Sequence, residues 1–197
     1  CNGLDDDCDG VIDNGDPGSG AACSTGQSGV CAAGTMHCQT GSLACVRNVN
    51  PSTEACNGLD DDCNGLVDDG ITATIGIPTT LTGIPGQTVV VPVQLSDVTG
   101  RGAFAAEVDV TFLSTVISPT SVAQGAALTG KGCTLEANLA IPGHVHVAIF
   151  CVQALVGGAS LADVSFQVVS STYGSTTVLG LPLAKLNEVC PVVTAQA

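Results

Sequence analysis

The chain has 197 residues and a formal net charge of −14, because 18 acidic residues face only 4 lysines and arginines. This balance argues against a nucleic-acid-binding surface, which needs a basic patch. No apolar run is long enough to predict a membrane span. Eleven cysteines indicate disulfides and therefore an oxidising compartment. We expect a secreted or cell-surface protein whose leader has been removed.

One stretch occurs twice, as CNGLDDDCDGVIDNG in residues 1–15 and as CNGLDDDCNGLVDDG in residues 56–70. Repetition of this kind marks a repeated structural unit. Each copy contains the pattern D-x-D-x-[DN]-G-x-x-D, which is the front part of a calcium-binding loop. Side-chain oxygens at alternate positions converge on one point, and the glycine allows a sharp turn. Calcium suits this pattern because it is a hard cation that prefers oxygen ligands.

The predicted ligands follow the loop positions, with position 7 acting through its backbone carbonyl. They are Asp5, Asp7, Asp9, Val11, Asp13 and Asp16 in the first loop, and Asp60, Asp62, Asn64, Leu66, Asp68 and Asp69 in the second. The last position departs from an EF-hand, where a glutamate is expected, because Asp16 and Ile71 stand there. Asp69 is therefore the candidate last ligand of the second loop. We expect affinities of roughly 10⁻⁴ to 10⁻³ M, as in extracellular modules.

A solvated acidic turn is the alternative interpretation of these loops. Three consecutive aspartates in each copy would repel one another without a cation, which favours calcium. Copper and zinc are disfavoured, because the ligands are all oxygen. The second copy is also preceded by Ser52-Thr53-Glu54-Ala55, which has no counterpart in the printed sequence before the first copy.

Between the loops, four cysteines alternate with small polar residues, which predicts a disulfide-stapled module over residues 1–70. A turn is expected at Thr40-Gly41. Four cysteines allow three pairings, and the sequence does not choose among them. The short spacings suggest Cys1–Cys8 and Cys56–Cys63 as separate local bridges. The cysteines predicted to be in disulfides are Cys1, Cys8, Cys23, Cys31, Cys38, Cys45, Cys56, Cys63, Cys133 and Cys151.

From residue 71 to residue 197 the apolar residues alternate with polar ones, which predicts about nine short strands in an antiparallel β-sandwich. Turn signals at Pro85-Gly86, Thr99-Gly100 and Pro142-Gly143 separate the strands. Cys133 and Cys151 flank the last of these turns at similar distances, so a bridge between them is plausible. Cys190 is left over, and we predict that it is unpaired or forms an intermolecular bond. The fold class expected is mainly β, with a small calcium-loop module before the sandwich.

Catalytic chemistry is not expected. His144 and His146 share one strand face, but no third metal ligand is evident, so we interpret them as exposed residues near a turn. The sequence contains neither G-x-S-x-G nor H-E-x-x-H, and its paired carboxylates lie only in the acidic loops. A hydrolase fragment is therefore the least favoured interpretation.

Two families share these motifs. CNGLDDDCDG-x-x-D and its intervening cysteine segments resemble the MopE-type metal-binding repeats of bacterial surface and secreted proteins, over residues 1–70. The segments PGQTVVVPV and VISP, with the 102–112 strand, resemble a cohesin over about residues 72–190. The cohesin resemblance implies a nine-stranded jelly-roll sandwich that binds a partner module. Cohesins of cellulosomes bind dockerins, which carry calcium loops of the same pattern, but the present loops are too far apart and too rich in cysteine to be a dockerin.

The favoured function is an extracellular, calcium-binding structural protein that self-associates, head to tail, into a filament or surface layer. Low charge in the sandwich and an exposed sheet edge favour self-association. The apolar tail, residues 189–197, is the expected strand donor to the next copy. The alternative is a surface adhesion or scaffold module whose sandwich binds another protein or a glycan.

Overall fold

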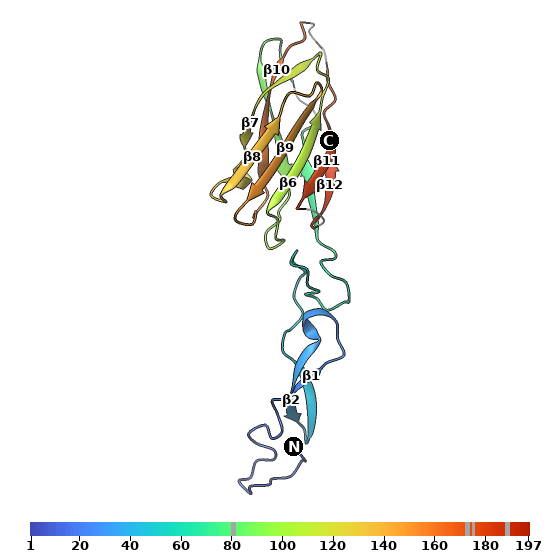
Figure 1. Ribbon diagram of the computed structural model, residues 1–197, viewed down its shortest axis with the longest axis vertical. Coiled ribbons are helices and arrows are strands. Elements are labelled where there is room, and N and C mark those ends of the chain that lie inside the picture. Colours follow the sequence, from blue (N-terminus) through green and yellow to red (C-terminus); the bar gives the residue numbers. More distant parts are fainter. Residues whose placement is uncertain (80–81, 172–173, 175, 188–189) are drawn as a thin grey trace. The chain divides into compact units, whose positions relative to one another are not determined.

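The computed structural model describes residues 1–79, 82–171, 174, 176–187 and 190–197, and it separates into two compact units, Cys1–Gly70 and Ile71–Ala197 (Figure 1). The regular elements are nearly all strands, joined by turns and two short 3₁₀ helices. In the described part of the chain, no helix has the length and apolarity needed to cross a membrane.

The first unit contains a small antiparallel sheet, in the order β1-β2-β3. Its strands are β1 (Ala22–Ser24), β2 (Ala33–Gln39) and β3 (Ser42–Arg47), and the 3₁₀ helix η1 (Gly29–Cys31) lies between the first two. The β2–β3 hairpin turns at Thr40-Gly41, as predicted. Both residues have positive φ, 49° and 83°, which suits the twist of a two-residue hairpin turn.

Disulfides and polar contacts replace an apolar core in this unit. Within residues 1–70, all of which the structure describes, Cys31 is the only buried apolar side chain. The larger apolar residues of the two acidic loops are exposed, namely Leu4, Val11, Ile12, Leu59, Leu66 and Val67. The bridges in this unit include Cys1–Cys38, Cys23–Cys45 and Cys31–Cys63. Small domains that cannot bury enough apolar surface depend on such cross-links.

The predicted local bridges Cys1–Cys8 and Cys56–Cys63 are wrong. Cys1 pairs with Cys38 and Cys63 with Cys31, while Cys8 is exposed and free. Cys56 is disulfide-bonded too. The physical reason is that pairing depends on which Cα atoms the fold brings within about 6 Å, not on separation along the chain. Each acidic loop curls around its aspartates and leaves its second cysteine to a distant segment, or to none.

The second unit is a sandwich of two sheets (Figure 1). One sheet has the strand order β12-β4-β5-β10-β7 and the other β11-β6-β9-β8. The described residues of this unit form nine strands, which confirms the predicted sandwich. They are β4 (Thr72–Gly76), β5 (Thr88–Leu95), β6 (Ala105–Thr111), β7 (Ile117–Gln124), β8 (Cys133–Asn138), β9 (His144–Cys151), β10 (Ser160–Val168), β11 (Gly180–Leu186) and β12 (Val192–Gln196), with the 3₁₀ helix η2 (Ala126–Leu128) after β7.

Alternation along the strands builds the core. In β9, Val145, Val147 and Ile149 are buried, whereas the residues between them face outward. The aromatic rings of Phe112 and Phe166 meet edge to face inside the sandwich, with centroids 5.0 Å apart. A continuous cluster of buried aliphatic residues from both sheets surrounds them. This unit therefore has the apolar core that the first unit lacks.

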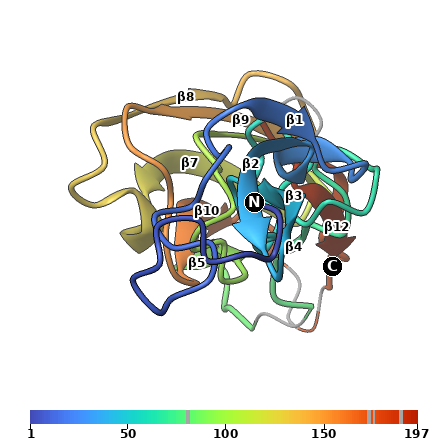
Figure 2. The ribbon, with the colours of Figure 1, turned by 90° about the horizontal axis from the view of Figure 1, so that it is seen from below.

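The β8–β9 hairpin turns at Pro142-Gly143, and its two strands run side by side (Figure 2). Cys133 and Cys151 lie directly opposite each other in its register and form a disulfide, with Cα atoms 4.0 Å apart. The prediction that Cys190 is unpaired or intermolecular is wrong, because Cys190 is disulfide-bonded within the chain. An odd count in one segment is a poor guide, since pairing follows the folded distances.

The carboxyl-terminal tail is used inside the sandwich. Its strand β12 pairs in parallel with β4, from Val192 opposite Thr72 to Gln196 opposite Gly76. The sandwich is therefore not wholly antiparallel. One side of β12 is therefore already paired within the chain, and donation of the tail to another copy stays a prediction.

Candidate metal centre and binding face

The first acidic loop winds around the carboxylate of Asp5. Its oxygens accept hydrogen bonds from the backbone N–H groups of Asp9 (3.2 Å) and Gly10 (2.9 Å). The bond from Gly10 contributes most to a lowered pKa of Asp5, so this carboxyl stays ionised at neutral pH. Gly10 has a φ of 94°, a conformation that favours glycine and lets the chain turn sharply.

Three of the predicted ligands in this loop come together. One carboxylate oxygen each from Asp5, Asp7 and Asp9 lies within 4.8 Å of the other two. Val11 donates its N–H to Asp9 (2.8 Å), and the Asn14 side chain donates a short hydrogen bond to the same carboxylate. Carboxylate oxygens are the ligand type that a hard cation prefers, so this group is a candidate cation site.

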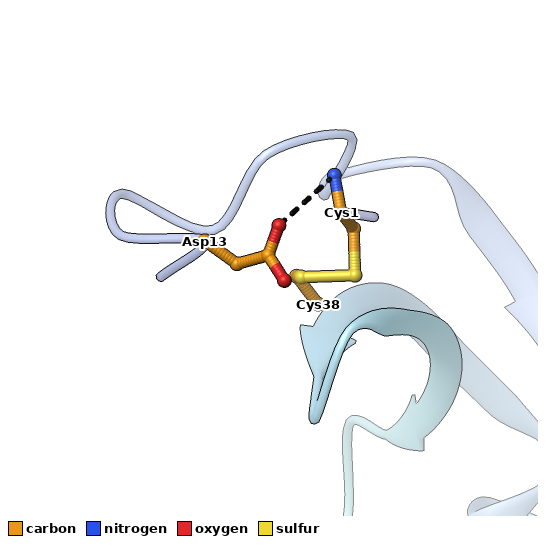
Figure 3. A group of neighbouring side chains, drawn as sticks. All are labelled: Cys1, Asp13 and Cys38. Atoms are coloured by element: carbon orange, nitrogen blue, oxygen red, sulfur yellow. Dashed lines mark ion pairs between the residues drawn. A yellow bond between two sulfur atoms is a disulfide. The ribbon is translucent and has the colours of Figure 1, made fainter. Parts of the chain in front are cut away.

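The other two carboxylates predicted for the first loop make structural contacts. Asp13 accepts N–H groups from Asn2 and Gly3, both at 2.9 Å, and the first of these bonds contributes most to its lowered pKa. It also lies beside the Cys1–Cys38 disulfide and 3.6 Å from the amino group of Cys1 (Figure 3). The two sulfurs are bonded to each other, so neither is a thiolate that could bind a metal.

Asp16 contacts strand β2. Its carboxylate accepts the N–H of Cys38 at 2.5 Å and pairs with Nδ1 of His37 at 2.7 Å. The Cys38 bond, followed by the contact with His37, lowers the pKa of Asp16. Asp16 therefore fastens the loop to the sheet, and the structure does not bring it into the group of Asp5, Asp7 and Asp9.

The second loop repeats this winding. Asp60 accepts the N–H groups of Asn64 (3.1 Å) and Gly65 (2.9 Å), and Asp68 accepts those of Asn57 and Gly58. Leu66 donates its N–H to the Asn64 side chain at 2.8 Å. Asp68 is therefore a loop-closing residue, in the same way as Asp13.

Asn64 links two further predicted ligands of the second loop. Its amide nitrogen donates hydrogen bonds to Asp62 and to Asp69, both at 3.1 Å. The side chain of Asn64 therefore holds Asp69 near the loop, although Asp69 is absent from the carboxylate group that the structure assembles there.

The carboxylate group at the second loop contains Glu54, which the sequence did not identify as a ligand. One oxygen each from Glu54, Asp60 and Asp62 lies within 4.8 Å of the other two. Glu54 and Asp60 are buried, with exposed fractions of 9% and 5%. Glu54 lies six residues before Asp60, ahead of the repeated motif, and only its position directly before the second copy could have drawn attention to it.

The sandwich presents a mixed polar and aromatic face on its four-stranded sheet. Across β6 and β9, His144 pairs with Asp109 (2.9 Å) and His146 with Glu107 (3.4 Å). Lys185 of β11 approaches Glu107 from the other side, at 3.9 Å. Both histidines therefore contact carboxylates on this face. Thr134, Glu136 and Asn138 lie opposite Phe150, Ala148 and His146 in the register, and so on the same face.

Phe150 is the exposed aromatic residue of this face. It is 63% exposed near the end of β9, and Val152, just beyond the strand, is 76% exposed. Large apolar side chains among polar and charged ones are typical of surfaces that bind proteins.

Comparison with known proteins finds similarity in the sandwich. The cohesin-domain family model matches residues 73–192, which is more than half of the chain. No curated protein is similar enough to the chain to count as a match.

Three solved cohesins illustrate the structural similarity. The sixth cohesin of scaffoldin B from Acetivibrio cellulolyticus, solved with a Cel5 dockerin, has 25% identity and a TM-score of 0.56 over 64% of this chain and 94% of that one. A non-cellulosomal cohesin from the archaeon Archaeoglobus fulgidus has 17% identity and a TM-score of 0.52 over 64% and 86%. A cohesin of a Clostridium thermocellum cohesin–dockerin complex has 12% identity and a TM-score of 0.53 over 68% and 94%.

The nine strands in two sheets, the family match and the structural similarity all identify the sandwich as a cohesin domain. Cohesin domains are protein-binding modules. The matched residues lie in the sandwich, so the assignment does not extend to the disulfide-rich unit of residues 1–70. The chain belongs to the cohesin family.

Proposed function

We propose that this chain is an extracellular scaffold module whose cohesin domain captures a dockerin-type protein. The family match carries the proposal, together with the similarity to a cohesin that was solved with a dockerin. The disulfides fit an oxidising compartment, which supports a location outside the cell or on its surface.

The outward face of the β11-β6-β9-β8 sheet is the surface we assign to the partner. It combines the exposed ring of Phe150 with the carboxylate–histidine pairs of β6 and β9. An aromatic anchor within a polar surround is the usual anatomy of a binding hot spot. Val90 is the comparable exposed apolar residue on β5 of the other sheet, where the neighbouring outward residues of β10 are Asp163, Ser165 and Gln167.

Calorimetry with a panel of purified dockerins, including the Cel5 dockerin, tests this proposal. We expect the chain to bind at least one of them. The Phe150→Ala variant should bind it roughly tenfold or more weakly, since an aromatic anchor of an interface commonly contributes about 2 kcal/mol. The matched control, Val90→Ala on β5, should bind as tightly as the unaltered chain. Failure of the whole panel, or equal losses in both variants, would contradict the proposed surface.

Self-association is the competing function. The sequence favours it through the low charge of the sandwich. Because β12 is paired with β4 on one side, assembly through the tail would use the other side of β12, at the edge of its sheet. Light scattering over a range of protein concentrations, with and without calcium, separates the two functions. A monomer that binds a dockerin supports the scaffold function, and filaments that form without a partner support the structural one.

Calcium binding by the acidic loops is the second activity we propose. Two groups of three carboxylates support it, namely Asp5, Asp7 and Asp9 in the first loop, and Asp60 and Asp62 of the second loop with Glu54 beside it. Because residues 1–70 contain little apolar core, cation binding would stabilise this unit more than the sandwich. Chelation should therefore speed cleavage by a serine protease at the exposed apolar residues of the loops, and leave the sandwich resistant. Equal protection of both units with and without chelator would contradict calcium binding at these loops.

A further inference from the structure

The buried carboxylate of Glu54 lies beside the second acidic loop but outside the repeated motif. Its Oε1 accepts the backbone N–H groups of Asp61 (2.6 Å) and Asp62 (2.8 Å). Its Oε2 is buried and has no hydrogen-bond partner. A buried carboxylate oxygen without a partner is costly, and such groups are normally paired or bound to a metal.

The neighbours of Glu54 make this cost larger. Oxygens of Glu54, Asp60 and Asp62 lie within 4.8 Å of one another, and no lysine or arginine forms an ion pair with them among the described contacts. Asp60 is itself buried, and both of its oxygens point inward to the backbone N–H groups of the loop. Asp62 is exposed, but Glu54 and Asp60 are shielded from water, and like charges at such distances then repel one another strongly.

We infer that Glu54 is a ligand of a divalent cation at the second loop, together with Asp60 and Asp62. Calcium is the ion whose chemistry fits best, because the three residues offer oxygens only and calcium accepts the irregular geometry of ligands from loop backbone. This inference rests on the proposed calcium binding and deepens it. It gives the second loop the acidic side chain that its sequence lacks at the last loop position, where Ile71 stands.

The site also joins three segments of the first unit. Glu54 belongs to the connector after β3, and Asp60 and Asp62 belong to the second loop. The carbonyl oxygen of Asp60 accepts the N–H of Val30 in η1 at 3.1 Å, beside the Cys31–Cys63 disulfide. A cation held by these carboxylates would therefore fix the connector and the loop where η1 packs on them.

Calorimetric titration of the chelator-stripped 197-residue chain with Ca²⁺ alone tests the inference, using Glu54→Gln. Glutamine keeps an oxygen that can accept the N–H groups of Asp61 and Asp62, but it removes the negative charge. We expect two binding events in the unaltered chain, and we expect Glu54→Gln to weaken one of them by roughly tenfold or more. The control is Asp163→Asn on β10 of the other sheet, which likewise replaces a carboxylate by its amide and should leave both binding events unchanged.

Thermal unfolding gives a second test. A calcium ligand and a merely structural residue should change the unfolding temperature in opposite directions in chelator. In chelator, Glu54→Gln should unfold residues 1–70 at a higher temperature than the unaltered chain, because it removes repulsion. In calcium it should unfold them at a lower temperature, because it removes a ligand. An equally lowered temperature in both conditions would show that the carboxylate of Glu54 stabilises the loop without a cation, and would overturn the inference.

The outcomes separate this inference from the calcium proposal itself. If the unaltered chain binds no calcium, both are overturned. If it binds two ions and Glu54→Gln binds them equally well, only the role of Glu54 is overturned. Should Glu54→Gln fail to fold, Glu54→Asp serves instead, because it keeps the charge but shortens the reach. Weaker binding at one site by folded Glu54→Asp supports the inference, and unaltered affinity contradicts it.

Discussion

The two acidic loops have nearly the same sequence and the same backbone, but different surroundings. Equivalent residues have matching positive φ values, 61° and 66° for Cys8 and Cys63, and 94° and 97° for Gly10 and Gly65. The same hydrogen bonds close both loops, from Gly10 to Asp5 and from Gly65 to Asp60, each at 2.9 Å. The local sequence therefore determines the shape of the loop.

The surroundings decide what each loop can do. In the second loop Asp60 is buried under η1, Cys63 is bonded to Cys31, and Glu54 adds a second buried carboxylate. In the first loop the acidic group consists of motif residues alone, and Cys8 is exposed and free. Identical motifs can therefore differ in stability and in ligand set, and the following experiments test that difference.

The largest effect is expected from the disulfide that holds the second loop. Replacing both Cys31 and Cys63, as Cys31→Ala and Cys63→Ser, removes a bridge with a sequence separation of 32 residues. We expect residues 1–70 to lose about 3 kcal/mol of stability, measured as amide hydrogen exchange of β2. The matched control, Cys8→Ser in the first loop, should leave the exchange rates unchanged. Comparable losses in the two variants would show that the loops are equally dependent on their second cysteine.

A smaller effect is expected where η1 meets the second loop. Gly29 has a φ of 55°, and a Cβ atom added there would lie 2.0 Å from the carbonyl oxygen of Asp60. Gly29→Ala should therefore destabilise the unit by about 2 kcal/mol or more, through strain and displacement of the loop. In the control Gly26→Ala, φ is also positive but nothing lies within 4 Å, so only about 1 kcal/mol should be lost. Urea unfolding followed by hydrogen exchange measures both variants, and equal losses would contradict the proposed packing.

The contact between Asp16 of the first loop and strand β2 should weaken in acid. The Cys38 N–H and then His37 lower the pKa of Asp16 below its ordinary value of 3.8. A lowered folded pKa means that the contribution of Asp16 to stability is complete above pH 3.8 and is lost as the pH falls through the folded pKa. In Asp16→Asn, the stability of β2, measured by hydrogen exchange over a series of pH values, should fall less steeply at acid pH. The control Asp163→Asn, on β10 of the sandwich, should leave the acid-pH dependence of β2 stability as steep as in the unaltered chain.

The smallest effect on stability is expected from chemical labelling of Cys8, the free cysteine of the first loop. Because Cys8 is exposed and free, a maleimide should label the native chain at Cys8 without changing its thermal unfolding. Mass spectrometry of the peptides identifies the labelled site. Labelling at Cys63 or Cys31 in the native chain would show that the second loop is not closed by its disulfide.

The sequence by itself determined the elements whose signals are local. Alternation of apolar residues predicted the sandwich, the Thr40-Gly41 turn predicted the β2–β3 hairpin, and the spacing of aspartates predicted loops that bring Asp5, Asp7 and Asp9 together. Each of these follows from contacts between residues close in the chain, or from a period that every strand repeats.

Only the tertiary structure decided the disulfide pairing of the first unit, the parallel pairing of β12 with β4, and the place of Glu54 beside Asp60, whereas the Cys133–Cys151 bridge follows from a hairpin that the sequence predicted. In each case the partners are brought together by the path of the chain, and nothing in their immediate neighbours specifies the partner. Cys8 and Cys63 make the point most directly. They occupy the same position of the same motif, and one is bonded because η1 supplies Cys31 next to it, whereas the other is free.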